Sequence, residues 1–199
     1  MTYSAYSEEF EGVVMALLTA IEAKDFKIRR HSERVAKFAL QIAGQLQLDE
    51  ETTCQLNYGA LLHDIGNIGM PDSILLKPTG LTEWEFDEMK LHPIIGEQIC
   101  KPLRSNSWLR PLIRSHHEKL DGSGYPDGLS GDAISLNIRI LSVVDVYDTL
   151  RSERSYRQAF GHEEALAIVR DEVNRGWWES SVVELLPGLT VSEDDFAPV

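Results

Sequence analysis

The chain has 199 residues and a formal net charge of −13, from 32 acidic and 19 basic side chains. This balance disfavours binding to a nucleic-acid polymer or to an anionic membrane surface, because both are negatively charged. The two cysteines, Cys54 and Cys100, lie far apart, which excludes a disulfide framework and a cysteine-based zinc module. No apolar run approaches the ~18 residues of a membrane span, and the N-terminus does not resemble a signal peptide. We therefore expect no membrane insertion and a cytoplasmic location.

Apolar residues recur at helical spacing along almost the whole chain. A first helix is predicted at about 7–24, a second along the stripe from Val35 to Leu46, and a third from an N-cap at Asp49 to His63. Thr82 and Glu85 form a capping box for a helix near 83–101. Further helices are predicted at about 108–118, 136–150, 162–174 and 179–186. Alternating strand patterns are absent from the sequence, so the predicted fold class is all-α.

Two segments, 65–80 and 119–133, concentrate glycine, proline, aspartate and serine. Long turn-rich loops in a helical domain usually serve function, so both are candidate parts of a site.

A single histidine is usually a surface or core residue, but the six histidines of this chain together form a pattern that indicates a site. The six are His31, His63, His92, His116, His117 and His162. His31 and His63 continue apolar stripes and should point inward, where an imidazole needs a partner. Asp64 follows His63 directly, and His116 and His117 are adjacent. Ligands from several helices of a bundle predict a metal cluster, and nitrogen and oxygen donors favour Fe, Mn, Co or Ni over a thiolate zinc site.

Four longer segments carry a resemblance to a known family. They are LLHDIGNIGMPDSILLKP, MKLHPIIGEQI, HHEKLDGSGYPDGLSGDAI and RILSVVDVYDTLRSERSYR. In this order they resemble the HD-GYP family, a branch of the HD metal-dependent phosphohydrolases, from about His31 to Arg157. The resemblance implies an HD-type helical bundle with additional C-terminal helices. It divides the chain into an N-terminal helix packed on the core (1–26), an HD-GYP domain (27–187) and a C-terminal tail (188–199).

The resemblance also implies an activity: hydrolysis of the bacterial second messenger cyclic di-GMP to linear pGpG and sometimes GMP. The implied metal ligands are His31, His63, Asp64, His92, His116, His117 and Asp145. They imply two divalent transition-metal ions, Fe or Mn first, with Ni, Co and Zn as alternatives, and Asp64 as the bridge. A water between two such ions ionises near neutral pH and attacks phosphorus in line. Asp148 receives no ligand role, and His162 is interpreted as a surface residue.

Three further residues are candidate substrate contacts. The turn-rich segment 119–133 contains the sequence GYP at 124–126 and is called the GYP loop below. Tyr125 of this loop is expected to stack on a guanine or to approach a phosphate, and Arg154 and Arg157 to contact phosphates. A merely structural loop and ion pairs with acidic neighbours are the alternatives.

The chain departs from the family at two positions. Asn67, counted with Asp64 as a catalytic candidate, stands where members usually carry a lysine thought to bind phosphate. Lys27 stands where three-metal members carry a glutamate, which predicts two ions rather than three. Lys27 is a candidate replacement for the missing charge.

Three functions follow from this pattern. The first is a cyclic di-GMP phosphodiesterase. The second, favoured by Asn67, is a weakly active or inactive cyclic-dinucleotide receptor or a module that binds a separate signalling protein through the GYP loop. The third is an HD enzyme for another phosphoester, against which the GYP segment argues. Dimerisation through the first helix is a further hypothesis.

Overall fold

A computed structural model describes residues 8–153 and 157–190. The longer helices are α1 (Glu8–Lys24), α2 (Phe26–Gln45), α3 (Glu50–Leu62), α6 (His92–Cys100), α8 (Leu136–Arg151) and α9 (His162–Asn174). The shorter ones are α4 (Asp72–Leu75), α5 (Glu83–Met89), α7 (Leu109–Ser115) and α10 (Ser180–Val183). Four 3-10 turns complete them: η1 (Ile65–Gly69), η2 (Arg104–Asn106), η3 (Gly131–Ala133) and η4 (Leu186–Gly188). These residues contain no β-strand, which confirms the all-α class.

The predicted helix starts are confirmed by their caps. The Asp49 side chain accepts a hydrogen bond from the Thr52 amide at 2.8 Å. Thr82 and Glu85 form both halves of a capping box at the start of α5. Each cap satisfies amide donors that the first turn of a helix leaves unpaired.

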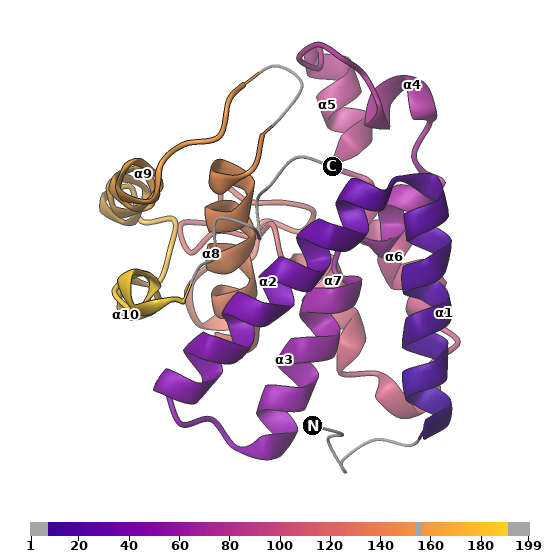
Figure 1. Ribbon diagram of the computed structural model, residues 1–199, viewed down its shortest axis with the longest axis horizontal. Helices are drawn as coiled ribbons and strands as arrows, with labels where there is room; N and C mark the ends of the chain where they lie inside the picture. Colours follow the sequence, from indigo (N-terminus) through magenta and orange to yellow (C-terminus); the bar gives the residue numbers. More distant parts are fainter. Residues whose placement is uncertain (1–7, 154–156, 191–199) are drawn as a thin grey trace.

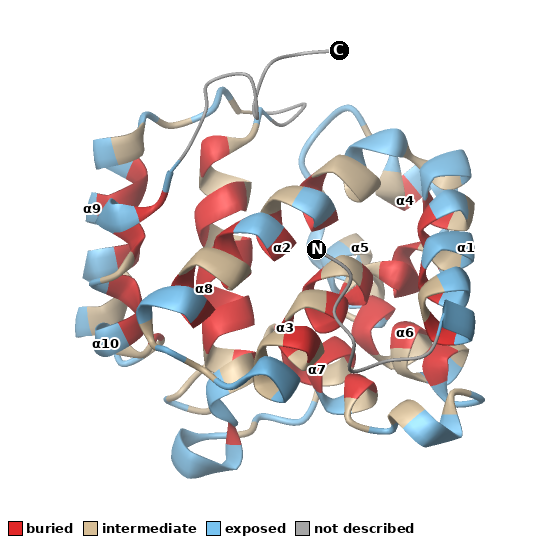
Figure 2. Ribbon diagram, turned by 60° about the horizontal axis from the view of Figure 1, so that its bottom comes forward, coloured by how far each residue is buried: buried red, intermediate tan, exposed pale blue. Residues whose placement is uncertain are grey.

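Helix α2 crosses the middle of the molecule, with α1 on one side and α8 on the other (Figure 1). Helices α9 and α10 pack on α8, while α3 lies along α2 and contacts α7. Buried residues concentrate on α8 (Figure 2), whereas none of the residues of α5 is buried. Within the described ranges, no helix combines the length and the apolar character that crossing a membrane requires.

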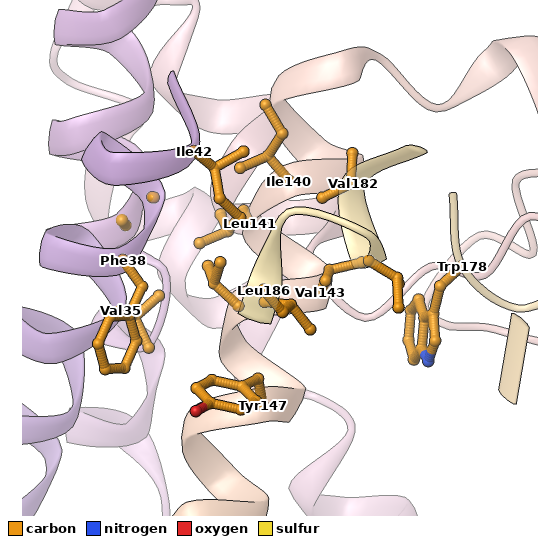
Figure 3. Packing of buried hydrophobic residues seen from close by; sticks show 14 of the residues in the cluster. Val35, Phe38, Ile42, Ile140, Leu141, Val143, Tyr147, Trp178, Val182 and Leu186 are labelled. Carbon is orange, nitrogen blue, oxygen red and sulfur yellow. The ribbon is translucent and has the colours of Figure 1, made fainter. Parts of the chain in front are cut away.

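The larger hydrophobic core joins α2 to α8 and to the C-terminal helices. Phe38 of α2 faces Tyr147 of α8, with 5.8 Å between the ring centroids (Figure 3). Val182 and Leu186 close the core from the C-terminal side. Because His31 lies on α2 and Asp145 on α8, the packing of these two helices in this core fixes the distance between the two side chains.

A smaller core packs α1 against α3 and α7. Phe10 of α1 lies 5.0 Å from the Tyr58 ring and 6.0 Å from the Trp108 ring, in edge-on arrangements. The predicted division of the chain at 26/27 and 187/188 stays a prediction. The proposed tail, 188–199, lies outside the described residues beyond residue 190.

The expected helix near 83–101 is wrong as a single element. Helix α5 ends at Met89, and α6 begins anew at His92 with Pro93 in its first turn. Proline has no amide to donate and is tolerated at a helix start, so Pro93 marks a boundary that the sequence already contained. The segment 65–80 is also more ordered than a loop, because it contains η1 and α4.

Candidate metal centre

The metal-ligand candidates lie on several helices or directly after them, and they meet in the interior. His31 lies in the second turn of α2, His63 and Asp64 directly follow α3, and His92 begins α6. His116 and His117 follow α7, and Asp145 lies in α8. His63 is completely buried, and only His117 and Asp64 keep intermediate exposure. The structure therefore brings together all seven residues that the sequence nominated.

Asp64 lies between two groups of histidines. Its Oδ1 is 3.2 Å from His92 Nε2, while its Oδ2 is 3.7 Å from His63 Nε2 and 3.9 Å from His31 Nε2. His92 belongs with His116 and His117 to a group whose ligand atoms lie within 4.8 Å of one another. One carboxylate that turns an oxygen to each group has the disposition of a bridging ligand.

Asp145, which lies on α8, directs its carboxylate at the same group of residues. Its Oδ1 lies 2.9 Å from His31 Nε2 and 3.7 Å from His63 Nε2, and its Oδ2 lies 3.8 Å from His117 Nδ1. Two carboxylates and five imidazoles thus share one interior site.

Hydrogen bonds to the chain fix three of the rings. The Nδ1 atoms of His63, His92 and His116 each lie 2.7–2.8 Å from the carbonyl oxygen three residues earlier. A carbonyl accepts only, so Nδ1 carries the proton and Nε2 keeps its lone pair toward the centre. This is the tautomer that binds a metal through Nε2. The Ser142 hydroxyl also donates to the His116 carbonyl at 2.6 Å, which ties the histidine pair to α8.

The residues fit a metal ion. His63 Nε2 is buried and has no hydrogen-bond partner, an arrangement that costs free energy unless a ligand takes its lone pair. Burial and the neighbouring His92 lower the pKa of His117 to about 3, and burial and His117 hold the pKa of His116 well below its usual value. Both imidazoles are therefore neutral, the form that ligates metals.

The carboxylates are held in their charged form. Burial opposes ionisation of Asp64, yet the neighbouring His63 and His92 keep its pKa well below its usual value. Burial likewise opposes charge on His31, but the hydrogen bonds that it donates to Asp145 and Asp148 raise the pKa of His31 to about 10. A metal that binds His31 Nε2 therefore displaces a proton.

Asp148 is a site residue that the sequence interpretation missed. It is completely buried, and its Oδ2 lies 2.6 Å from His31 Nδ1. The available signal was its spacing: Asp148 lies three residues after Asp145, on the same face of α8.

The GYP loop is fastened beside the centre. The Tyr125 ring lies 4.7 Å from the His117 ring at an interplanar angle of 33°. The buried Glu118 carboxylate accepts hydrogen bonds from the amides of Asp127 and Leu129 at 2.7 and 2.9 Å. At Gly124 a Cβ would lie 2.6 Å from the His117 carbonyl oxygen and 2.4 Å from backbone atoms of Glu118 and Lys119, so only glycine fits there. The sequence interpretation missed Glu118, whose charge is unusual for a fully buried side chain.

The other nominated residues differ in their surroundings. Lys27 is exposed one helical turn before His31. Asn67 is buried, and its side-chain oxygen has no hydrogen-bond partner. Arg157 donates to the carbonyls of Thr149, Leu150 and Gln158, and its role as a phosphate contact stays a prediction. Arg154 lies outside the described residues.

His162 is more than a surface residue. Its Nδ1 lies 2.7 Å from the hydroxyl of the buried Tyr147, so it joins α9 to α8.

The fold and the site define a helical protein with a buried histidine–aspartate metal centre. The family described as "HD domain" matches residues 16–182. The chain belongs to this HD domain family, and the resemblance of its motifs to the HD-GYP branch is confirmed.

Relatives and solved structures agree with this assignment. The chain is 38% identical over 186 residues to a 3'3'-cGAMP-specific phosphodiesterase 3 of Vibrio cholerae, covering 94% of this chain and 40% of that protein. It is 42% identical over 175 residues to the cyclic di-GMP phosphodiesterase response regulator RpfG of Xanthomonas campestris, covering 86% and 46%. Bd1817, an HDG"Y"P protein from Bdellovibrio bacteriovorus, shares the fold with a TM-score of 0.67 and 22% identity, over 81% of this chain and 51% of that one. The chain thus spans less than half the length of these two curated relatives.

Proposed function

We propose that this protein is a metal-dependent phosphodiesterase that hydrolyses cyclic di-GMP, or a close cyclic dinucleotide, to linear pGpG, with GMP as an alternative end product. The observation that carries the proposal is the position of Asp64 between two histidine groups, with separate oxygens 3.2 Å from His92 and 3.7 Å from His63. The names of the relatives, which act on cyclic di-GMP or 3'3'-cGAMP, support the substrate class.

The proposed cofactor is a pair of divalent ions, Fe or Mn first. When bound, such a pair lowers the pKa of water and neutralises charge on phosphoryl oxygens. His92, His116 and His117 with Asp64 would hold one ion, and His31 and His63 with Asp64 and Asp145 the other. Five neutral imidazoles and two carboxylates leave a net positive charge on a doubly loaded site. That charge suits a substrate with two phosphates on a protein of net charge −13.

The remaining side chains position the substrate in this proposal. The Tyr125 ring, fastened beside His117, offers an aromatic face to a guanine. Lys27, exposed one turn before His31, offers an ammonium group for a phosphate. The role of Arg154 as a phosphate contact stays a prediction.

Asn67 favours a second candidate function, a receptor that binds the dinucleotide with little or no turnover. The neutral amide replaces a lysine charge, and charged hydrogen bonds contribute about 1.5–3 kcal/mol. Its burial limits how far it can reach toward a ligand.

Partners and location belong to the same proposal. The GYP loop is the proposed contact for a separate signalling protein. Helix α1 is the proposed dimer surface, with Val13 and Met15 exposed at 38% and 51%. The two free cysteines suit a reducing compartment such as the cytoplasm.

Product analysis tests the enzyme against the receptor. The protein is purified without oxygen, loaded with Mn(II) or Fe(II), incubated with cyclic di-GMP or 3'3'-cGAMP, and the products are separated by chromatography. Linear dinucleotide from the parent and none from Asp64→Ala supports the phosphodiesterase. Equal product from Asp64→Ala refutes the assigned site. Dinucleotide binding without product, at two metals per chain, favours the receptor.

A further inference from the structure

His31 is held differently from the other metal-ligand candidates. The rings of His63, His92 and His116 bond to a carbonyl oxygen three residues earlier in the chain. His31 Nδ1 instead lies 2.6 Å from a carboxylate oxygen of Asp148, 117 residues later. A charged acceptor makes a stronger hydrogen bond than a carbonyl and makes the opposite ring nitrogen a better donor to a metal.

Asp148 is itself held by an arginine from the helix that carries His31. Arg34 donates from Nε to Asp148 Oδ1 at 2.7 Å and from Nη2 to Oδ2 at 2.8 Å. The Ser152 hydroxyl adds a bond to Oδ2 at 3.2 Å and accepts one from Arg34 at 2.9 Å. The Asp148 side chain is fully buried, and only 13% of the Arg34 side chain is exposed. A planar guanidinium that grips both oxygens leaves the carboxylate a single orientation.

We propose that Asp148, oriented by Arg34, is a positioning residue that directs His31 Nε2 at the metal centre and makes one of the two metal positions tighter than the other. When a metal displaces the proton of Nε2, the atom that lies 2.9 Å from Asp145, Asp148 still accepts the remaining N–H at Nδ1 and the Nε2 lone pair is directed at the ion. This inference rests on the metal occupancy in the proposed function, but not on substrate turnover.

The inequality of the two positions follows from their donors. The His31 side combines His63 with the oxygens of Asp64 and Asp145, and one of its rings is backed by a carboxylate. The other side has three imidazoles, His92, His116 and His117, with one oxygen of Asp64 at 3.2 Å, and Asp145 approaches it only at His117, over 3.8 Å. Negative charge near a cation strengthens its binding, so the His31 side should fill first.

Titration with Mn(II), followed by electron paramagnetic resonance and total metal analysis, tests the inference without substrate. In Asp148→Asn one amide oxygen still accepts from His31, but the charge is lost. We expect the affinity of the tighter site to fall about 10–100-fold, while the weaker site keeps its parental affinity. Visible absorption of the Co(II)-loaded protein should change as well, since it reports the ligand field of the bound ion. The control is Glu179→Gln, which removes a carboxylate paired with Arg139 at 2.6 Å and should leave both affinities at the parental value.

A second variant covers the case in which Asp148→Asn does not fold. Arg34→Lys keeps a cation but cannot grip both oxygens of Asp148, so we expect a loss at the lower end of the same range at the same site. Parental affinities at both sites in a folded Asp148→Asn protein overturn the proposal. If only the Arg34→Lys protein folds, metal affinities equal to those of the parent at both sites overturn the proposal. Two equal sites in the parent overturn the predicted inequality. Absence of dinucleotide hydrolysis with intact metal binding refutes only the proposed enzyme.

Discussion

Gly66, two residues after Asp64, lies where η1 contacts α6, which begins with His92, and its lack of a side chain lets the two backbones approach closely. A Cβ at this position would lie 1.8 Å from the His92 carbonyl oxygen and 2.6 Å from the Gly96 amide nitrogen, whereas real Cβ contacts stay above 3.0 Å. Both neighbours are backbone atoms, so no side chain can rotate away. We predict that Gly66→Ala forces η1 and α6 apart.

The magnitude follows from these contacts. The nearest one has to open from 1.8 Å to at least 3.0 Å, and the two segments carry Asp64 and His92, whose ligand atoms are only 3.2 Å apart. Overpacking costs about 1–3 kcal/mol where side chains adjust. Because the backbone must move here, we expect a loss of unfolding free energy at the upper end of that range. The metal affinity should fall with it.

Urea unfolding of the metal-free protein and Mn(II) titration measure the two effects. The matched control is Gly12→Ala, the same substitution in the interior of α1, where a Cβ meets no heavy atom within 4 Å. Alanine is the better helix former, so this variant should gain about 0.5–1 kcal/mol. The reasoning is refuted if Gly66→Ala is as stable as the parent and binds two metals with parental affinity.

Three further predictions concern pH, packing and metal removal. The hydrogen bond from Lys77, with those from Thr82, lowers the pKa of Glu85 from its usual 4.5 to about 2, so its stabilising contribution is present above pH 4.5 and is lost as the pH falls toward 2. Thermal unfolding should show a flatter pH dependence in that window for Glu85→Gln, and an unchanged slope would contradict this. Phe38→Ala should lower the unfolding free energy by about 3–5 kcal/mol in urea, because the ring is fully buried against Tyr147, and a loss below 1 kcal/mol would mean that the site collapses freely. Chelation should lower the Tm of the metal-loaded parent but not that of Asp64→Ala, because only the native centre binds the ions tightly; equal shifts would argue against this site.

Much of the centre was predictable because its signals are local. The stripe with Val35 and Phe38 placed His31 on the inner face of a helix, and the structure buries it there. The adjacent pairs His63–Asp64 and His116–His117 predicted a metal cluster, and the resemblance to the family implied the individual ligands. Helix periodicity decides which way such residues point, and it needs no knowledge of the partner helices.

The remainder depends on contacts between distant segments. Asp148 meets His31 only because α8 packs on α2, so its spacing from Asp145 places it on the right helix face but does not reveal its partner. The need for glycine at Gly66 arises from the backbone of α6, which no periodicity describes. Arg157 donates hydrogen bonds to carbonyl oxygens in the last turn of α8. Because these carbonyls lack helical partners only where the helix ends, this role cannot be predicted before the end of α8 is known. The break before α6 is different, because Pro93 was a visible signal for it in the sequence. The prediction of one helix over 83–101 did not take this signal into account.

Some histidine rings are hydrogen-bonded to a nearby residue and His31 to a distant one, and this difference affects when each ring can be oriented during protein synthesis. A nascent chain can orient His63 and His92 as soon as each local turn forms, since their acceptors lie three residues back. His31 is synthesised before either of them, yet its hydrogen bond to Asp148 cannot form until Asp148 has left the ribosome and α8 has packed on α2. Closing that 117-residue separation costs more chain entropy than closing a single turn. We therefore expect the earliest of these three ligands in the sequence to be the last to reach its final orientation.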